Sequence, residues 1–264
     1  MNAPRRATGD RRPGPGVSPW RRTVRYWLSR SAVWVMARGY LRFRVEGRER
    51  LPDGPAIYAF NHLSWLDPFV LMAVLPFRPR LFFFGPKEED MRRGGRNRLM
   101  VWTGSAIPYK PGKNDLLAAT RHVAAVIESG GVVAIAAEGR IGAIEDRLWP
   151  LNEGPAFFAL RSGVPLVPIA INGTSWVAFG RRVRIRIGEP IMAVGRPDRA
   201  GIAGMTVVLA ERLGGLVSGA PAVAPPGRPG RWITEQFNDW PEGSREATHA
   251  AALHQGVTVP DEGA

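Results

Sequence analysis

The segment that most constrains the fold is residues 57–68, where an apolar run is followed within a few residues by the start of a helix. Ile57–Phe60 is apolar and aromatic and follows a Pro-Asp-Gly-Pro turn, which predicts a buried strand. Pro68 lacks a backbone N–H and has a fixed φ, so it suits the first turn of a helix that continues to Leu75, with Asp67 as its N-cap. A buried strand that leads into a helix is typical of an α/β sheet.

The same alternation of strands and helices continues along the chain. Further strands are expected at 41–45, 80–84, 132–137, 163–171 and 182–188, and helices at 87–102, 114–129, 154–161 and 203–217. The run at 132–137 is the most continuous apolar segment, so we place it in the centre of the sheet. We therefore predict an α/β fold, namely an αβα layered domain with a mixed sheet of roughly seven strands.

Composition divides the chain into four parts. Residues 1–19 are rich in Arg, Gly and Pro and lack the apolar core of a signal peptide, so we expect a disordered basic leader. An amphipathic helix at 20–40 and the layered domain at 41–218 follow. From residue 219 a Pro/Gly-rich linker leads into a tail with few periodic apolar residues, and we expect 219–264 to be poorly ordered.

Positive charge is concentrated near the start of the chain. The net charge is +13, and residues 1–50 hold 13 arginines against three acidic residues. Such a basic segment is typical of proteins that bind nucleic acid or an anionic membrane surface. Interleaved tryptophans in 20–40 favour the membrane, but Arg30 and Arg38 would fall inside any membrane span. We expect a helix in the membrane surface with its arginines outward and its tryptophans at headgroup level; the alternative is a first helix packed on the domain.

Several kinds of chemistry are excluded by missing residues. The chain contains no cysteine, which excludes disulfides, thiolate metal sites and an acyl-cysteine intermediate. No set of histidines and acidic residues has metal-ligand spacing, so no metal is expected. The sequence also lacks the GxSxG turn, the GxxxxGKS/T phosphate loop and the GxGxxG dinucleotide motif.

His62 and Asp67 form the candidate catalytic pair. Four residues separate them across the predicted turn, so the Asp67 carboxylate can accept the Nδ1–H of His62 and leave Nε2 free as a base. Each residue alone has an ordinary structural explanation, because aspartate before proline commonly caps a helix and a single histidine is commonly structural. The two together indicate general-base chemistry.

Residues 61–67, Asn-His-Leu-Ser-Trp-Leu-Asp, resemble the NHxSxxD block of the 1-acylglycerol-3-phosphate acyltransferase family of phospholipid synthesis. The resemblance implies an O-acyltransferase that moves a fatty acyl group from acyl-CoA or acyl carrier protein to a lyso-lipid hydroxyl, with 1-acylglycerol-3-phosphate as the expected acceptor. It assigns catalysis to His62 and Asp67, and substrate contacts to Asn61 and Ser64. It requires no bound cofactor, and it implies a peripheral protein at the cytoplasmic face of the cell membrane with no nucleic-acid partner.

Other segments resemble the remaining blocks of the family, so the resemblance covers about residues 41–192 within the domain. In the second block, Lys110 stands where the family has an arginine that binds the phosphate of the acceptor. The three lysines of the chain, at positions 87, 110 and 113, all fall in this segment, so Lys87 and Lys110 are assigned to substrate binding. The strand at 163–171 resembles the fourth block, and we expect it to line the acyl pocket.

The third block departs from the family pattern. Glu138 and Gly139 are kept at the end of the strand, but Arg140 stands in the usual threonine position and Ile141 in that of the usual arginine. We expect Glu138, Gly139 and Arg140 at the substrate site, since open α/β sheets bind ligands at strand ends. The departure keeps two alternatives open: a family member with another acceptor, and a non-catalytic lipid-binding protein on this fold. A nucleic-acid-binding protein is supported by net charge alone.

Overall fold

The computed structural model describes residues 19–85, 100, 102–109, 115–142 and 144–238. Its strands are β1 (Arg42–Glu46), β2 (Ile57–Phe60), β3 (Leu81–Phe84), β4 (Ala106–Ile107), β5 (Val132–Ala136), β6 (Leu166–Asn172) and β7 (Arg182–Ile187). They form one seven-stranded sheet in the order β1-β7-β6-β2-β5-β3-β4. Only β6 and β7 pair antiparallel among these strands, so the predicted mixed sheet is confirmed.

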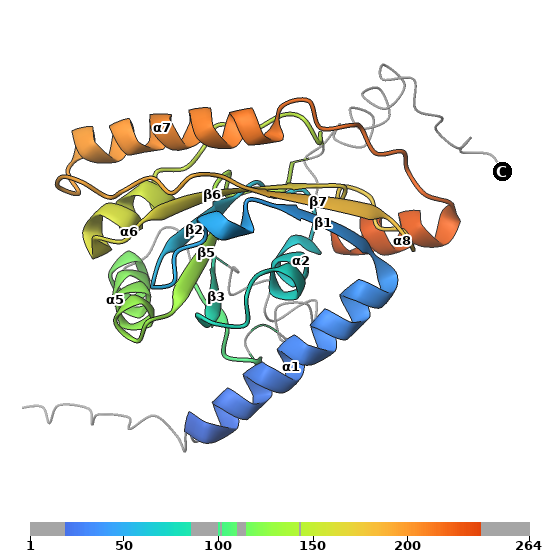
Figure 1. Cartoon of the computed structure of the whole chain (residues 1–264), viewed down its shortest axis with the longest axis horizontal. Coiled ribbons are helices and arrows are strands. Elements are labelled where there is room, and N and C mark those ends of the chain that lie inside the picture. Colours follow the sequence, from blue (N-terminus) through green and yellow to red (C-terminus); the bar gives the residue numbers. More distant parts are fainter. Residues whose placement is uncertain (1–18, 86–99, 101, 110–114, 143, 239–264) are drawn as a thin grey trace, which may run out of the picture.

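Helices cover both faces of this sheet. They are α1 (Pro19–Tyr40), α2 (Asp67–Val74), α5 (Asp115–Glu128), α6 (Gly154–Ser162), α7 (Arg199–Val217) and α8 (Arg228–Phe237), with a 3-10 helix at Arg48–Arg50. In Figure 1, α1 and α2 lie on one side of the sheet and α6 and α7 on the other. One buried cluster contains α2, and a second contains α5, α6 and α7. The predicted layering is confirmed, while most of the helix expected at 87–102 lies outside the described residues.

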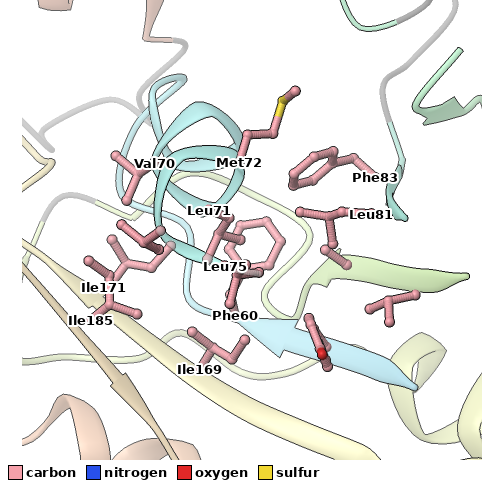
Figure 2. Close-up of a cluster of buried hydrophobic side chains, with 14 of the residues drawn as sticks. Phe60, Val70, Leu71, Met72, Leu75, Leu81, Phe83, Ile169, Ile171 and Ile185 are labelled. Carbon is pink, nitrogen blue, oxygen red and sulfur yellow. The ribbon is translucent and has the colours of Figure 1, made fainter. Parts of the chain in front are cut away.

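Strand β2 shows how alternation builds the two cores. Tyr58 and Phe60 belong to the core on the α2 side, whereas Ile57 and Ala59 belong to the core on the α6 side. Figure 2 shows Leu71 of α2 close to the ring of Phe60. Since nearly all of α2 is buried, its sequence is apolar on every side instead of on one stripe.

Helix α1 packs on the domain with one face and exposes an apolar stripe on the opposite face. Tyr26, Arg30 and Val33 are buried on the inner face. Four of the exposed apolar residues, which we call the α1 stripe, are Trp20, Val24, Leu28 and Val35. Their spacing of four and seven residues puts them on one side of the helix. The expectation that the arginines point outward is therefore wrong for Arg30, and the alternative of a helix packed on the domain holds for the inner face.

Arg30 fastens α1 to the C-terminal end of α2. Its guanidinium donates to the carbonyls of Leu75 and Pro76, at 2.8 and 2.7 Å. Arg48 donates to the carbonyl of Val74, at the same helix end. Cations are favoured there because a helix C-terminus leaves carbonyls unpaired and carries the negative end of the helix dipole. The buried charge of Arg30 is thus used to join two helices.

Among the described helices, α7 is long and apolar enough to cross a membrane, with a mean hydropathy of 1.4. In the structure it lies across the sheet against β6. Its buried residues are Met205, Leu209, Leu213 and Val217, a repeat of four that forms one narrow stripe. Helix α7 is therefore an outer helix of the layered domain.

Helix α8 follows the Pro/Gly-rich linker and packs back on the domain. Thr234 is fully buried, and its hydroxyl oxygen accepts the N–H of Val177 at 2.9 Å. A Cβ on Gly230 would lie 2.7 Å from the carbonyl oxygen of Val177, so the close approach needs glycine. The segment expected to be a linker and poorly ordered tail therefore includes a docked helix. Residues 1–18 and 239–264 lie outside the described residues.

Candidate active site

Neighbouring parallel strands bring the candidate residues to one edge of the sheet. β2 lies between β5 and β6 and is parallel to both. Phe60, the last residue of β2, is in register with Ala136, the last residue of β5. His62 therefore leaves the sheet beside Glu138. This is the edge at which open α/β sheets place ligand-binding groups.

Asp67 holds the ring of His62. Nδ1 of His62 lies 2.9 Å from Oδ2 of Asp67. Because a carboxylate can only accept, Nδ1 carries the proton, and Nε2 of the neutral ring keeps its lone pair. The Asp67 side chain is fully buried, whereas 19% of the His62 side chain is exposed. The pair has the geometry of an oriented general base at the protein surface.

The same oxygen of Asp67 organises the turn between the two residues. Oδ2 accepts the N–H of Leu63 at 2.7 Å and the N–H of Ser64 at 2.9 Å. The prediction that Asp67 is the N-cap is wrong, because Leu66 is the N-cap and Asp67 is already in the first turn of α2. Its side chain bends back into the turn instead of capping the helix. Oδ1 is buried and has no hydrogen-bond partner among the described residues.

Asn61 and Ser64 support the turn from its two ends. The buried Asn61 amide donates to the carbonyl of Ile171 at 2.9 Å and accepts the N–H of Ile171 at 2.7 Å. It thereby continues the pairing of β2 with β6 beyond Phe60. The buried Ser64 hydroxyl oxygen accepts the N–H of Leu66 at 3.2 Å. Both side chains contact backbone, and their assignment to substrate binding stays a prediction.

Glu138 holds His62 from the neighbouring strand. Oε1 accepts the N–H of His62 at 3.1 Å, and Oε2 accepts the N–H of Trp149 at 3.0 Å. Burial raises the pKa of Glu138 above its ordinary value, although the two N–H groups favour the carboxylate. The acid therefore ties the loop after β5 to the end of β2, and a direct substrate contact stays a prediction.

Gly139 and Arg140 begin a loop that runs beside His62. Gly139 has a φ of 65°, and a Cβ there would lie 2.1 Å from a neighbouring side-chain nitrogen, so this turn favours glycine. The exposed guanidinium of Arg140 stacks on Trp149, 3.6 Å from the ring centroid. The loop is bonded to the main chain of His62, because the N–H of Gly142 donates to the carbonyl of His62 at 2.6 Å. A cation thus lies on the loop that borders the candidate pair, His62 and Asp67.

Comparison with known proteins identifies the family. A family model described as Acyltransferase matches residues 42–172. The chain belongs to the acyltransferase family. The matched range of this acyltransferase contains the turn from His62 to Asp67 and the acid Glu138, and it ends before α8.

Three curated relatives of the acyltransferase are named 1-acyl-sn-glycerol-3-phosphate acyltransferases. One from Chlamydomonas reinhardtii is 24% identical over 178 residues, which is 66% of this chain and 52% of the algal protein. Two chloroplastic relatives, BAT2 of Brassica napus and LPAT1 of Arabidopsis thaliana, are 24% identical over 59% of this chain. The match covers 44% and 43% of those two proteins. The chain thus spans about half the length of the curated relatives it matches.

A solved structure shares the fold of the acyltransferase. PlsC from Thermotoga maritima, titled a 1-acyl-sn-glycerophosphate (LPA) acyltransferase, matches with a TM-score of 0.55 and 19% sequence identity. The match covers 74% of this chain and 78% of PlsC. At this identity the likeness concerns the arrangement of strands and helices.

Some predicted site residues of the acyltransferase cannot be placed. Lys87 and Lys110 lie outside the described residues, so their assignment to substrate binding stays a prediction. Within the described part of the chain, no group of three or more histidine or acidic side chains is close enough to hold a metal ion.

Glu145 is a buried acid near the site that sequence reasoning missed. Its carboxylate accepts the N–H of Gly173 at 2.8 Å, and the N–H and hydroxyl of Ser175 at 3.1 and 2.6 Å. Burial raises the pKa of Glu145 above its ordinary value, and the negative charge of Asp67 acts in the same direction. Glu145 ties the loop after Glu138 to the end of β6. Nothing in the sequence distinguishes this acid from one in an exposed loop.

Proposed function

We propose that this chain transfers a fatty acyl group from a thioester, either acyl-CoA or acyl carrier protein, to the hydroxyl of a lyso-lipid, with 1-acylglycerol-3-phosphate as acceptor. The observation that carries the proposal is the pairing of His62 with Asp67, at 2.9 Å between Nδ1 and Oδ2. The family match and the names of the curated relatives support the choice of reaction and acceptor.

The proposed mechanism is direct transfer assisted by one base. Nε2 of His62 removes the proton of the acceptor hydroxyl while the oxygen attacks the thioester carbonyl. Asp67 stabilises the positive charge that develops on the ring, because its Oδ2 already accepts the Nδ1–H. The tetrahedral intermediate then expels the thiolate, which takes the proton from Nε2. The products are the new ester and a free thiol, and His62 is neutral again.

Glu138 positions the base in this mechanism. The main chain of His62 is bound from β5 through Oε1 of Glu138, while the ring is bound from α2 through Asp67. Two attachments from different elements limit both translation and rotation of the imidazole. Such limits matter because a misplacement of about 1 Å can cost roughly 100-fold in rate.

Arg140 is the proposed contact for the phosphate of the acceptor. Its stacking on Trp149 orients the guanidinium plane and leaves the N–H edge available to an anion. The loop that carries it is bonded to His62 through Gly142. Lys87 and Lys110 are proposed as further contacts with the substrates.

The α1 stripe is the proposed contact with an anionic membrane surface. Its exposed apolar residues supply burial in the interface, and the arginines of residues 1–50 supply attraction to acidic headgroups. This surface differs from the one expected from sequence, because exposed apolar side chains face away from the domain together with exposed arginines such as Arg38, while Arg30 is buried. The cytoplasmic face of the cell membrane is the proposed location.

The proposed activity is tested by comparing His62→Ala with His122→Ala, an exposed histidine on α5. With labelled acyl-CoA and 1-acylglycerol-3-phosphate, loss of the base should lower turnover by about 10²–10⁴-fold. Thermal unfolding should be unchanged, and His122→Ala should behave like the wild type. Normal turnover in folded His62→Ala would refute the catalytic assignment. A wild-type protein that binds lipid without acyl transfer would refute the enzyme itself.

The acceptor is tested in the same assay with Arg140→Ala. We expect this change to raise the KM for 1-acylglycerol-3-phosphate much more than the KM for the acyl donor. Higher turnover on a neutral lyso-lipid, unaffected by Arg140→Ala, would exclude the phosphate-bearing acceptor and keep only the acyltransferase class.

Membrane binding is tested with two matched substitutions. Val35 on the α1 stripe is 61% exposed, and Val207 on α7, across the sheet, is 58% exposed. Burial of a valine side chain is worth about 1.5–3 kcal/mol, so Val35→Gln should weaken binding to anionic liposomes by about tenfold or more. Val207→Gln should leave binding unchanged. Equal effects of the two substitutions would show that the α1 stripe is not the contact surface.

A further inference from the structure

Every backbone N–H of the catalytic turn has an identified acceptor. The N–H of residue 62 bonds to Glu138, those of residues 63 and 64 to Asp67, and those of residues 66 and 67 to Ser64. The remaining one, the N–H of Trp65, donates to Oδ1 of Asn238 at 2.9 Å, across a sequence separation of 173 residues. Asn238 directly follows α8 and lies beyond the residues that the family model matches.

The end of α8 also holds the side chain of Trp65. The ring of Phe237 lies 5.0 Å from the Trp65 ring, centroid to centroid. The ring of Phe69 on α2 lies 5.9 Å from the Trp65 ring. Aromatic contacts at these distances stabilise a fixed ring orientation. Two consecutive residues, Phe237 and Asn238, therefore fix both the ring and the main chain of a residue midway between His62 and Asp67.

This clamp is itself attached to the domain away from the turn. The N–H of Val177 donates to Thr234 in the middle of α8. Arg181 donates to the carbonyl of Ala224 in the linker at 3.0 Å. Both attachments are to the connection between β6 and β7, so α8 and the linker are also held to the domain at points outside the turn.

We propose that Asn238 is a positioning residue for acyl transfer, which holds the catalytic turn through the N–H of Trp65. The proposal rests on the proposed function of the His62–Asp67 pair. Without the acceptor, the Trp65 N–H must turn toward water, because unpaired N–H groups are disfavoured inside a protein. That rotation would disturb the bonds of Leu63 and Ser64 to Asp67 Oδ2, the oxygen that also orients His62.

The experiment compares three variants of the full chain. Asn238→Leu has similar size but no acceptor, Asn238→Asp keeps an acceptor oxygen, and Gln236→Leu makes the same chemical change at an exposed position of α8. We expect Asn238→Leu to lower kcat by about 10- to 100-fold with both KM values within about twofold of the wild type, as for a misplaced base. Asn238→Asp should restore most of kcat, and Gln236→Leu should have no effect.

Amide exchange gives a second readout, and its measurement on the wild-type protein needs no folded variant. The Trp65 amide should exchange slowly, and Asn238→Leu should expose it selectively. A normal kcat in folded Asn238→Leu, equal impairment of Asn238→Asp, or rapid exchange of the wild-type Trp65 amide would each overturn the proposal. Absence of acyl transfer by the wild type would instead refute the proposed function, since the exchange result does not depend on activity.

Discussion

Asp67 has a structural role in the turn and a proposed catalytic role, and substitutions by Asn and Ala should separate them. Its Oδ2 accepts three hydrogen bonds, from Leu63 N–H at 2.7 Å, Ser64 N–H at 2.9 Å and His62 Nδ1 at 2.9 Å. An asparagine can place its carbonyl oxygen where Oδ2 lies and keep all three bonds, but without the negative charge. An alanine leaves the N–H groups of Leu63 and Ser64 without an acceptor at a position that is fully buried.

These losses have different magnitudes. Each buried N–H left unpaired costs about 1–3 kcal/mol, so Asp67→Ala should lose about 2–6 kcal/mol of unfolding free energy. For a domain of this size that corresponds to a fall of about 5–20 °C in Tm. Asp67→Asn should lose only about 1–2 kcal/mol, since its bonds become neutral but persist. Turnover should fall by about 100-fold or more in both variants, because neither stabilises the charged ring of His62.

Thermal unfolding followed by circular dichroism, together with the acyl-transfer assay, distinguishes the two roles. The expected pattern is a small fall in Tm with lost turnover for Asp67→Asn, and a larger fall in Tm with lost turnover for Asp67→Ala. Equal destabilisation by the two substitutions would refute the account of the turn. Retained turnover in Asp67→Asn would refute the need for a charged partner of His62.

Two further predictions concern buried ionisable groups other than His62 and Asp67. Arg30→Met should lower the unfolding free energy by about 2–6 kcal/mol in chemical unfolding, because the carbonyls of Leu75 and Pro76 lose a charged donor. Arg38→Met, at an exposed position of α1, should change it little. Equal losses in the two variants would contradict a stabilising contact of Arg30 with these carbonyls. Between the ordinary carboxyl pKa of 4.5 and its raised folded value, Glu145 binds more protons in the folded than in the unfolded state, so the unfolding free energy falls as pH rises through this window. Glu145→Gln should lack this contribution, and parallel stability curves of variant and wild type from mildly acidic to neutral pH would refute it.

Most of the fold could be predicted because its signals are local. Ile57–Phe60 was expected as a strand and forms β2, and the apolar run at 132–137 was expected in the sheet centre and forms β5 beside it. The composition of such a run is enough to predict that it is buried, because apolar side chains need no partner of a particular type. The predicted N-cap role of Asp67 is wrong because aspartate before proline usually caps a helix, and the sequence alone does not show the competing donors. In the folded turn its carboxylate instead accepts backbone N–H groups such as that of Leu63.

The parts of the site that could not be predicted depend on partners distant in sequence. His62 and Asp67 were found because they lie within one turn, but the sequence does not show that Glu138 binds the N–H of His62. For Arg30, amphipathic spacing could not reveal the two carbonyls at the end of α2 that make burial of a cation favourable. Asn238 lies in a segment whose composition predicts disorder, and its proposed role follows only from the docking of α8.

The bonds that hold the catalytic turn have a consequence for the order of events during synthesis. They join Asn61 to Ile171, His62 to Glu138 and Trp65 to Asn238, over 110, 76 and 173 residues. Loop closure over such separations costs entropy before any contact is gained, and the N-terminal part of a chain leaves the ribosome first. His62 and Asp67 therefore exist in the growing chain well before the groups that align them. A nascent polypeptide, or one cut short before α8, carries both side chains, but on the proposed role of Asn238 it lacks their full alignment until α8, the last of the described helices, has docked.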